Sequence, residues 1–106
     1  MTQTSPALFG PTLPNTPEAR RAGAILTIDL DALKANWRTC AAQAPTAECG
    51  AVVKASAYGV DDGRAALALR EAGCKTFFVA SIDEGIRLRS GLGEDGAIHV
   101  LNGLMD

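Results

Sequence analysis

The stretch from Ala51 to Leu101, AVVKASAYGVDDGRAALALREAGCKTFFVASIDEGIRLRSGLGEDGAIHVL, decides the fold because two hydrophobic patterns alternate along it. Short, nearly continuous apolar runs are typical of strands covered on both faces, and apolar residues at intervals of three or four are typical of helices. The predicted order is strand 51–57, helix 61–73, strand 76–80, helix 81–91 and strand 97–101. This βαβαβ order predicts an α/β fold, in which crossover helices cover a parallel sheet.

Residues at the helix ends support these boundaries. Asp61 or Asp62 is suited to begin the first helix, because an aspartate side chain can accept a hydrogen bond from a free backbone amide of the first turn. Ser81 and Glu84 have the spacing of a capping box, in which each side chain accepts a hydrogen bond from the backbone amide of the other residue. Gly91 is predicted to close the second helix.

The chain before this stretch predicts less structure. The segment AILTIDL, residues 24–30, is typical of a short strand, and a helix follows it, begun by Asp29 or Asp31. Residues 1–23 hold four of the five prolines and lack periodicity, so we expect a mobile leader. Three parallel strands have two unpaired edges, so residues 24–106 are incomplete as a domain and are expected to be the first part of a larger barrel or open sheet.

Composition excludes several classes of function. The 106 residues carry a net charge of -2 with no basic block, which argues against nucleic acid as a partner. Three widely spaced cysteines suggest neither a disulfide framework nor a zinc site, and a reducing cytoplasm fits them best. No apolar segment approaches the ~20 residues that span a bilayer, so no membrane segment is predicted.

One motif resembles a dinucleotide-binding loop and is rejected. GLGEDG, residues 91–96, matches G-x-G-x-x-G, but that fingerprint requires a strand before it and a helix after it. Here the order is reversed, and Glu94 and Asp95 would repel a phosphate. We therefore predict a turn that uses glycines for positive φ. His99 lies in a strand without neighbouring ligands and is assigned no role, and no metal site is predicted.

Lys54 is the residue that demands an explanation, because it lies within an apolar run where an ammonium group is costly to bury. Only the carboxyl end of the strand offers it space, and active sites of βα folds lie at that end. A lysine that has lost part of its hydration there can attack a carbonyl to form a Schiff base. The alternative is a lysine whose aliphatic stem lies along apolar surface and whose charge reaches the rim. The pattern alone leaves both open.

Tyr58 lies four residues beyond Lys54 and directly before Gly59, in the loop that leads to the next helix. A phenol in a glycine-containing βα loop can donate a hydrogen bond to an anionic oxygen such as that of a phosphate. The alternative is a half-buried loop tyrosine without a role. With Lys54, it would place an amine and a phenol at one rim of the sheet.

These residues resemble the pyridoxal-phosphate lysine motif of the alanine racemase family. AVVKASAYGV is similar to that motif, usually written A-V-V-K-A-N-A-Y-G-H-G, with Ser56 in place of Asn and Val60 in place of His. TIDLDALKANWR, FFVASIDEGIRLRSG and IHVLNGL resemble neighbouring segments of the same family in matching order. The resemblance covers most of the chain after the leader, from about Ile25 to Met105.

The resemblance implies that residues 24–106 are the N-terminal part of a pyridoxal-phosphate-binding (β/α)₈ barrel, followed in the family by a β domain. It implies a homodimer that interconverts L-alanine and D-alanine and supplies D-alanine for peptidoglycan. Lys54 would hold the cofactor through a Schiff base and act as a base, Tyr58 would bind the cofactor phosphate, and Leu101 would contact the cofactor. Ile25 to Ile28 would pair with the β domain.

Other functions stay open beside this one. The second base and the substrate-binding residues of the family would lie outside these 106 residues, so the chain alone is expected to be inactive. It could be a truncated, non-catalytic fragment that binds the cofactor. A related pyridoxal-phosphate barrel enzyme is the other alternative, either a broad-specificity amino-acid racemase or a decarboxylase.

Overall fold

A three-stranded parallel sheet lies at the centre of the structure, which is a computed structural model that describes residues 14–104. Its strands are β1 (Ala51–Val52), β2 (Thr76–Val79) and β3 (Ala97–Val100), in the order β1-β2-β3. Both neighbouring pairs are parallel, with Val52 beside Phe78 and Phe78 beside His99. The predicted α/β fold with a parallel sheet is therefore confirmed.

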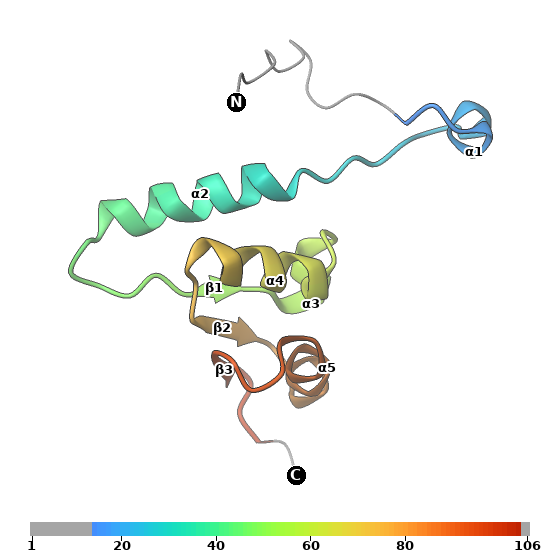
Figure 1. Cartoon of the computed structure of the whole chain (residues 1–106). Helices are drawn as coiled ribbons and strands as arrows, with labels where there is room; N and C mark the ends of the chain where they lie inside the picture. The colour runs from blue at the N-terminus through green and yellow to red at the C-terminus, as the bar shows by residue number, and fades with distance from the viewer. Residues whose placement is uncertain (1–13, 105–106) are drawn as a thin grey trace.

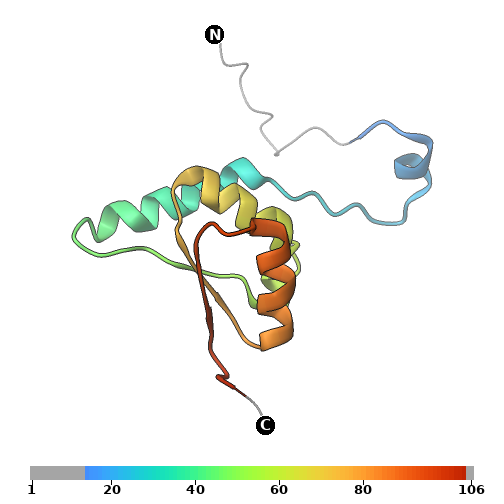
Figure 2. The same cartoon turned by 60° about the horizontal axis from the view of Figure 1, so that its bottom comes forward.

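The three longest helices form layers on one side of this sheet, whereas the short helix α1 (Pro17–Arg21) lies away from it (Figures 1 and 2). α4 (Asp62–Ala72) connects β1 to β2, and α5 (Ile82–Leu92) connects β2 to β3. α2 (Leu30–Gln43) packs on the outside of α4, and Nε1 of Trp37 donates to the carbonyl oxygen of Cys49 at 3.2 Å. This bond ties α2 to the segment that enters β1.

The core lies between the helices and one face of the sheet. Because side chains alternate along a strand, Phe77 and Val79 both face the helices, and neither is exposed to solvent. Buried leucines and alanines of α4 and α5 pack against them: Ala65, Ala66, Leu69, Leu88 and Leu92.

The opposite face of the sheet is open in the part of the chain that the structure describes. Val52 of β1 is 45% exposed, and the ring of His99 stacks on that of Phe78 with centroids 5.1 Å apart. A parallel sheet is normally covered on both faces. The open face agrees with the expectation that these strands belong to a larger barrel or open sheet.

The predicted helix starts are confirmed, and one predicted end is wrong. Asp61 caps α4, and the capping box of Ser81 and Glu84 begins α5. Gly91 does not close α5, because the helix continues to Leu92, whose side chain is buried in the core. Gly93 follows with a φ of 70°, and the chain turns there.

A prediction about the first thirty residues is also wrong. The described part of the leader contains a short helix, α1 (Pro17–Arg21), and the predicted strand follows it in sequence. The segment 24–30 is not a strand: residues 24–29 connect α1 to α2 without regular structure, and Leu30 already belongs to α2 (Figure 2). A strand needs a partner for its backbone groups, and Leu26 is 79% exposed with no described strand beside it. Residues 1–13 of the leader lie outside the described residues.

Candidate active site at the carboxyl end of the sheet

Lys54 lies at the carboxyl end of β1, where sequence analysis placed it. Directly after β1, the backbone amide of Val53 donates to the carbonyl oxygen of Phe78 in β2 at 2.9 Å. The side chain of Val53 is buried beneath the helices, and Lys54 is half-buried. Among residues 14–104, no carboxylate forms an ion pair with its amine. The amine is thus available to a ligand.

The chain beyond Lys54 does not continue as a strand, so the prediction of a strand over 51–57 is wrong. Four consecutive residues, Ala55 to Tyr58, have φ values of 52°, 54°, 53° and 57°. They form a left-handed helical turn, α3 (Lys54–Tyr58), in which the amide of Ala57 donates to the carbonyl oxygen of Val53 at 3.1 Å. The left-handed conformation costs an L-residue roughly 1–2 kcal/mol, and none of the four is glycine. Such strain persists only where the surroundings impose it.

Three contacts hold the turn in this conformation. The side chain of Ala57 is buried in the core, and the carbonyl oxygen of Ser56 accepts from the amide of Asp61 at 2.9 Å. The third contact comes from α5, where Oε2 of Glu84 accepts from the amide of Ala55 at 2.6 Å. That hydrogen bond, together with those from Ser81 and the preceding alanine, lowers the pKa of the Glu84 carboxyl from its usual value.

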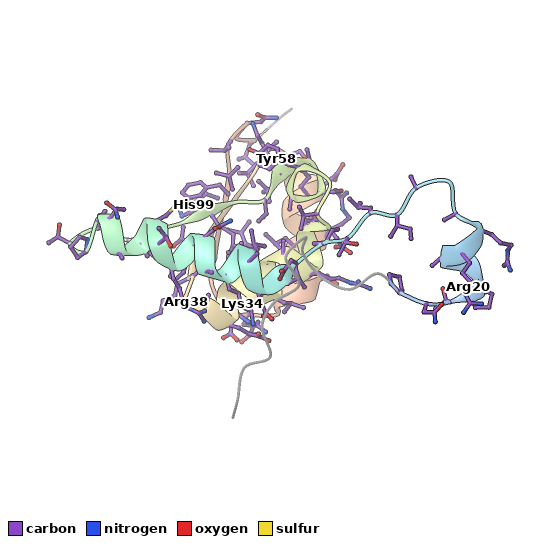
Figure 3. All side chains as sticks on the ribbon, turned by 90° about the horizontal axis from the view of Figure 1, so that it is seen from above. Arg20, Lys34, Arg38, Tyr58 and His99 are labelled. Carbon is purple, nitrogen blue, oxygen red and sulfur yellow. The ribbon has the colours of Figure 1, made fainter. Side chains whose placement is uncertain are left out.

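Tyr58 ends the turn that Lys54 begins, so the predicted amine and phenol belong to one five-residue segment. The Tyr58 side chain is 66% exposed, and its hydroxyl has no hydrogen-bond partner among the described residues. It lines a groove of about 420 Å³ beside residues 26–29 and the start of α2, which Lys54 does not line. Figure 3 shows Tyr58 and His99 on the same side of α2, opposite Lys34.

Leu101 lies at the same edge of the sheet as Lys54. It follows β3 directly, and its amide donates to the carbonyl oxygen of Val79 at 2.8 Å. The carboxyl ends of parallel strands lie together, and β2 lies between β1 and β3. The backbones at Lys54 and Leu101 are therefore two strand spacings apart, roughly 10 Å. Leu101 is 55% exposed, which leaves an apolar surface at this edge.

The glycine-rich loop that was rejected as a phosphate site lies before β3, at the opposite edge of the sheet. Nη1 of Arg89 donates to the carbonyl oxygens of Gly93, Asp95 and Gly96 at 3.0, 3.2 and 3.1 Å. The carbonyl oxygens of the loop therefore bind the guanidinium group of Arg89. A phosphate site would instead present backbone amides to its ligand.

Glu84 is the member of the site that sequence reasoning missed. The capping box predicted that one oxygen of Glu84 accepts from the backbone amide of Ser81 at the start of α5. The second oxygen binds a residue 29 positions earlier in the chain, and no local pattern signals this contact.

Comparison with known proteins gives a consistent result. The sequence model of a family described as alanine racemase, N-terminal domain, matches residues 28–106. The alanine racemase of Methylobacterium nodulans is 58% identical over 81 residues, which cover 76% of this chain and 22% of that protein. A protein of Agrobacterium fabrum described as alanine racemase, catabolic, is 52% identical over 79 residues, covering 74% of this chain and 20% of that protein.

A solved structure has the same fold over the same region. The crystal structure of alanine racemase from Bartonella henselae, with covalently bound pyridoxal phosphate, matches with a TM-score of 0.71 and 49% sequence identity. The match covers 74% of this chain and 22% of that one. The chain spans about a fifth of the length of the relatives it matches.

Proposed function

The chain belongs to the alanine racemase family, and on this premise we propose that it supplies the cofactor-binding lysine of a pyridoxal-phosphate-dependent alanine racemase. The observation that carries the proposal is the position of Lys54. Lys54 is half-buried and follows β1 at the carboxyl ends of the parallel strands, where βα barrels bind their ligands. The related Bartonella henselae structure holds its pyridoxal phosphate covalently.

The residues at this edge fit pyridoxal phosphate by their chemistry. The Lys54 amine would bind the aldehyde carbon of the cofactor. The exposed hydroxyl of Tyr58 would donate to a phosphate oxygen, and the exposed side chain of Leu101 would give apolar contact to the ring. Lys54 and Tyr58 are the first and last residues of α3, so that one turn would present both groups. When bound, the cofactor supplies the electron sink for the negative charge that develops on the α-carbon of alanine.

Lys54 would also move the proton on one side of the substrate. After release from the cofactor, its neutral amine would take the proton from the α-carbon, and the ammonium form would return it. Racemisation needs a second acid–base group on the opposite side. Tyr58 is the only tyrosine of the chain and is assigned to the phosphate. We therefore propose that the second group comes from outside these 106 residues, in a homodimer of the complete enzyme.

A second candidate function is cofactor binding without turnover. The open face of the sheet and the coverage of about a fifth of the relatives' length favour it for the 106 residues taken alone. Incubation of the chain with L-alanine and pyridoxal phosphate separates the two candidates. D-Alanine above the cofactor-only background would exclude this second candidate.

The proposal for Lys54 is tested by cofactor binding to two matched variants. Lys54→Ala should abolish the saturable visible absorbance of the bound cofactor, and Lys75→Ala should leave it unchanged. Lys75 is the suitable control because it is exposed and lies before β2, at the opposite edge of the sheet. If the two variants bind the cofactor alike, the assignment of Lys54 is wrong.

Activity is tested by replacing the matching segment of the Methylobacterium nodulans racemase with the segment from this chain. We expect the chimera to form D-alanine, and the same chimera with Lys54→Ala to form none. D-Alanine formation by the Lys54→Ala chimera at the parent rate would refute the proposal.

We also propose that the enzyme acts in the cytoplasm and supplies D-alanine for peptidoglycan. Growth of a D-alanine auxotroph that carries the active chimera tests the supply.

A further inference from the structure

We propose that Glu84 is a positioning residue for Lys54, because its carboxylate ties the turn that begins at the lysine to the end of β2 and the start of α5. The role of Lys54 rests on the proposed function above. The contact between Glu84 and the turn stands independently of it. Glu84 does not touch the reacting atoms, and its effect would pass through the backbone of Ala55.

The argument begins with the place where the strand pairing stops. In a continued parallel ladder, the amide of Ala55 would donate to the carbonyl oxygen of Ala80, as the amide of Val53 does to Phe78. The left-handed turn prevents this, and the carbonyl oxygen of Ala80 instead accepts from Asn102 at 3.0 Å. The amide of Ala55 would then have no protein partner. Oε2 of Glu84 accepts its hydrogen bond in place of the strand.

The two oxygens of the carboxylate have separate partners. Oε1 accepts from the amides of Ala80 and Ser81, both at 3.0 Å, at the end of β2 and the start of α5. Oε2 accepts from Ala55 alone, at 2.6 Å. A carboxylate can accept from Ala55 and from the amides of Ala80 and Ser81 at the same time, because both of its oxygens are acceptors. The side-chain amide of a glutamine has only one oxygen that can accept.

Among the three contacts that hold the turn, this is the one at its Ala55 end. The other two lie further along, at the carbonyl oxygen of Ser56 and the side chain of Ala57. Ala55 and Ser56 are exposed, and the buried side chain of Ala57 is two residues beyond the amide that Glu84 binds. Left-handed backbone is unfavourable for alanine and serine. Without Glu84, the peptide next to Lys54 loses the bond that keeps it in place, and the direction of the lysine side chain is no longer fixed.

Three variants of the chain separate positioning from stability and from charge. Glu84→Gln replaces one of the two accepting oxygens with an NH₂ group, so the side chain can no longer accept from Ala55 and from Ala80 and Ser81 through separate oxygens. Ser81→Ala removes the hydroxyl that accepts from the Glu84 amide and donates to Oε1 of Glu84, both at 3.3 Å. It leaves Oε2 free to accept from Ala55, so it controls for loss of helix capping. Asp83→Asn removes a neighbouring negative charge from the same first turn of α5, so it controls for charge.

Two measurements are made on each variant: the amide proton shift of Ala55 by NMR, and the affinity for pyridoxal phosphate at Lys54. Glu84→Gln should move the Ala55 signal upfield and weaken cofactor binding about tenfold, the effect of losing one hydrogen bond to a charged group. Ser81→Ala and Asp83→Asn should leave the Ala55 signal in place. The charge removed by Asp83→Asn should change the affinity by less than about twofold.

The outcomes distinguish this proposal from the proposed function. An unchanged Ala55 signal in Glu84→Gln overturns the contact itself. An affinity of Glu84→Gln equal to that of Ser81→Ala overturns the positioning of Lys54. If the unmodified chain binds no cofactor at Lys54, the proposed function fails, and with it the positioning of a cofactor lysine. The Ala55 signal then still decides whether Glu84 holds the turn.

Discussion

Replacing Ala55 with glycine should stabilise the chain, although glycine usually destabilises a helix. Ala55 has a φ of 52° and a ψ of 49°, and it is exposed, so its methyl group contributes little packing. Left-handed backbone costs alanine about 1–2 kcal/mol, and the entropy lost when glycine is ordered is about 0.5–1 kcal/mol more than for alanine. The free energy of unfolding should therefore rise by about 0.5–1 kcal/mol in Ala55→Gly.

Ala35→Gly is the matched control, because Ala35 is an exposed alanine within the right-handed helix α2. It should lower the free energy of unfolding by about 1 kcal/mol. Equilibrium unfolding in urea, followed by the fluorescence of Trp37, measures both variants. With a slope of about 1–2 kcal/mol per molar urea, Ala55→Gly should raise the midpoint by roughly 0.25–1 M, and Ala35→Gly should lower it by roughly 0.5–1 M. A loss of stability in Ala55→Gly equal to that of Ala35→Gly would refute the left-handed turn.

Three further predictions test other parts of the structure. Gly50→Ala should lower the free energy of unfolding by about 1–3 kcal/mol, because the added carbon would lie 2.7 Å from the ring of Phe78; an unchanged urea midpoint would contradict that packing. The folded state lowers the pKa of Glu84, so its contribution to stability is present above the pKa of the unfolded chain and is lost as the pH falls through the folded pKa. Glu84→Gln should flatten this part of the stability–pH curve, and an identical acid dependence would count against the contact with the turn. Burial raises the pKa of the Cys74 thiol, so a thiol reagent should modify the exposed Cys40 first and Cys74 only as the chain unfolds; equal rates would contradict the core position of Cys74.

The parts of the fold that local patterns determine were predictable from the sequence. The order of strands and helices follows from the change in hydrophobic period, and the start of α5 follows from the Ser81–Glu84 capping box. Lys54 was also identified locally, as a charge in an apolar run. Each of these signals lies within one element or its immediate neighbours.

The parts that depend on distant contacts were not predictable. Residues 24–30 alternate like a strand, but a strand forms only beside a partner, and the described residues offer none. The left-handed turn after Lys54 contains no glycine to signal a positive φ. It is held by Glu84, which lies 29 positions further along the chain. Local propensity favours the opposite hand at these positions, so the tertiary contact decides the backbone.

Competition among the three lysines of the chain tests the central claim most directly. The chain is incubated with an equimolar amount of pyridoxal phosphate and reduced with borohydride, and the modified lysine is identified by peptide mapping. Lys34 is held by Glu71 at 2.6 Å, and Lys75 is exposed, so simple accessibility favours Lys75. We predict that the label is found on Lys54. Label on Lys75 in preference to Lys54 would contradict the claim that the carboxyl end of β1 is a cofactor site.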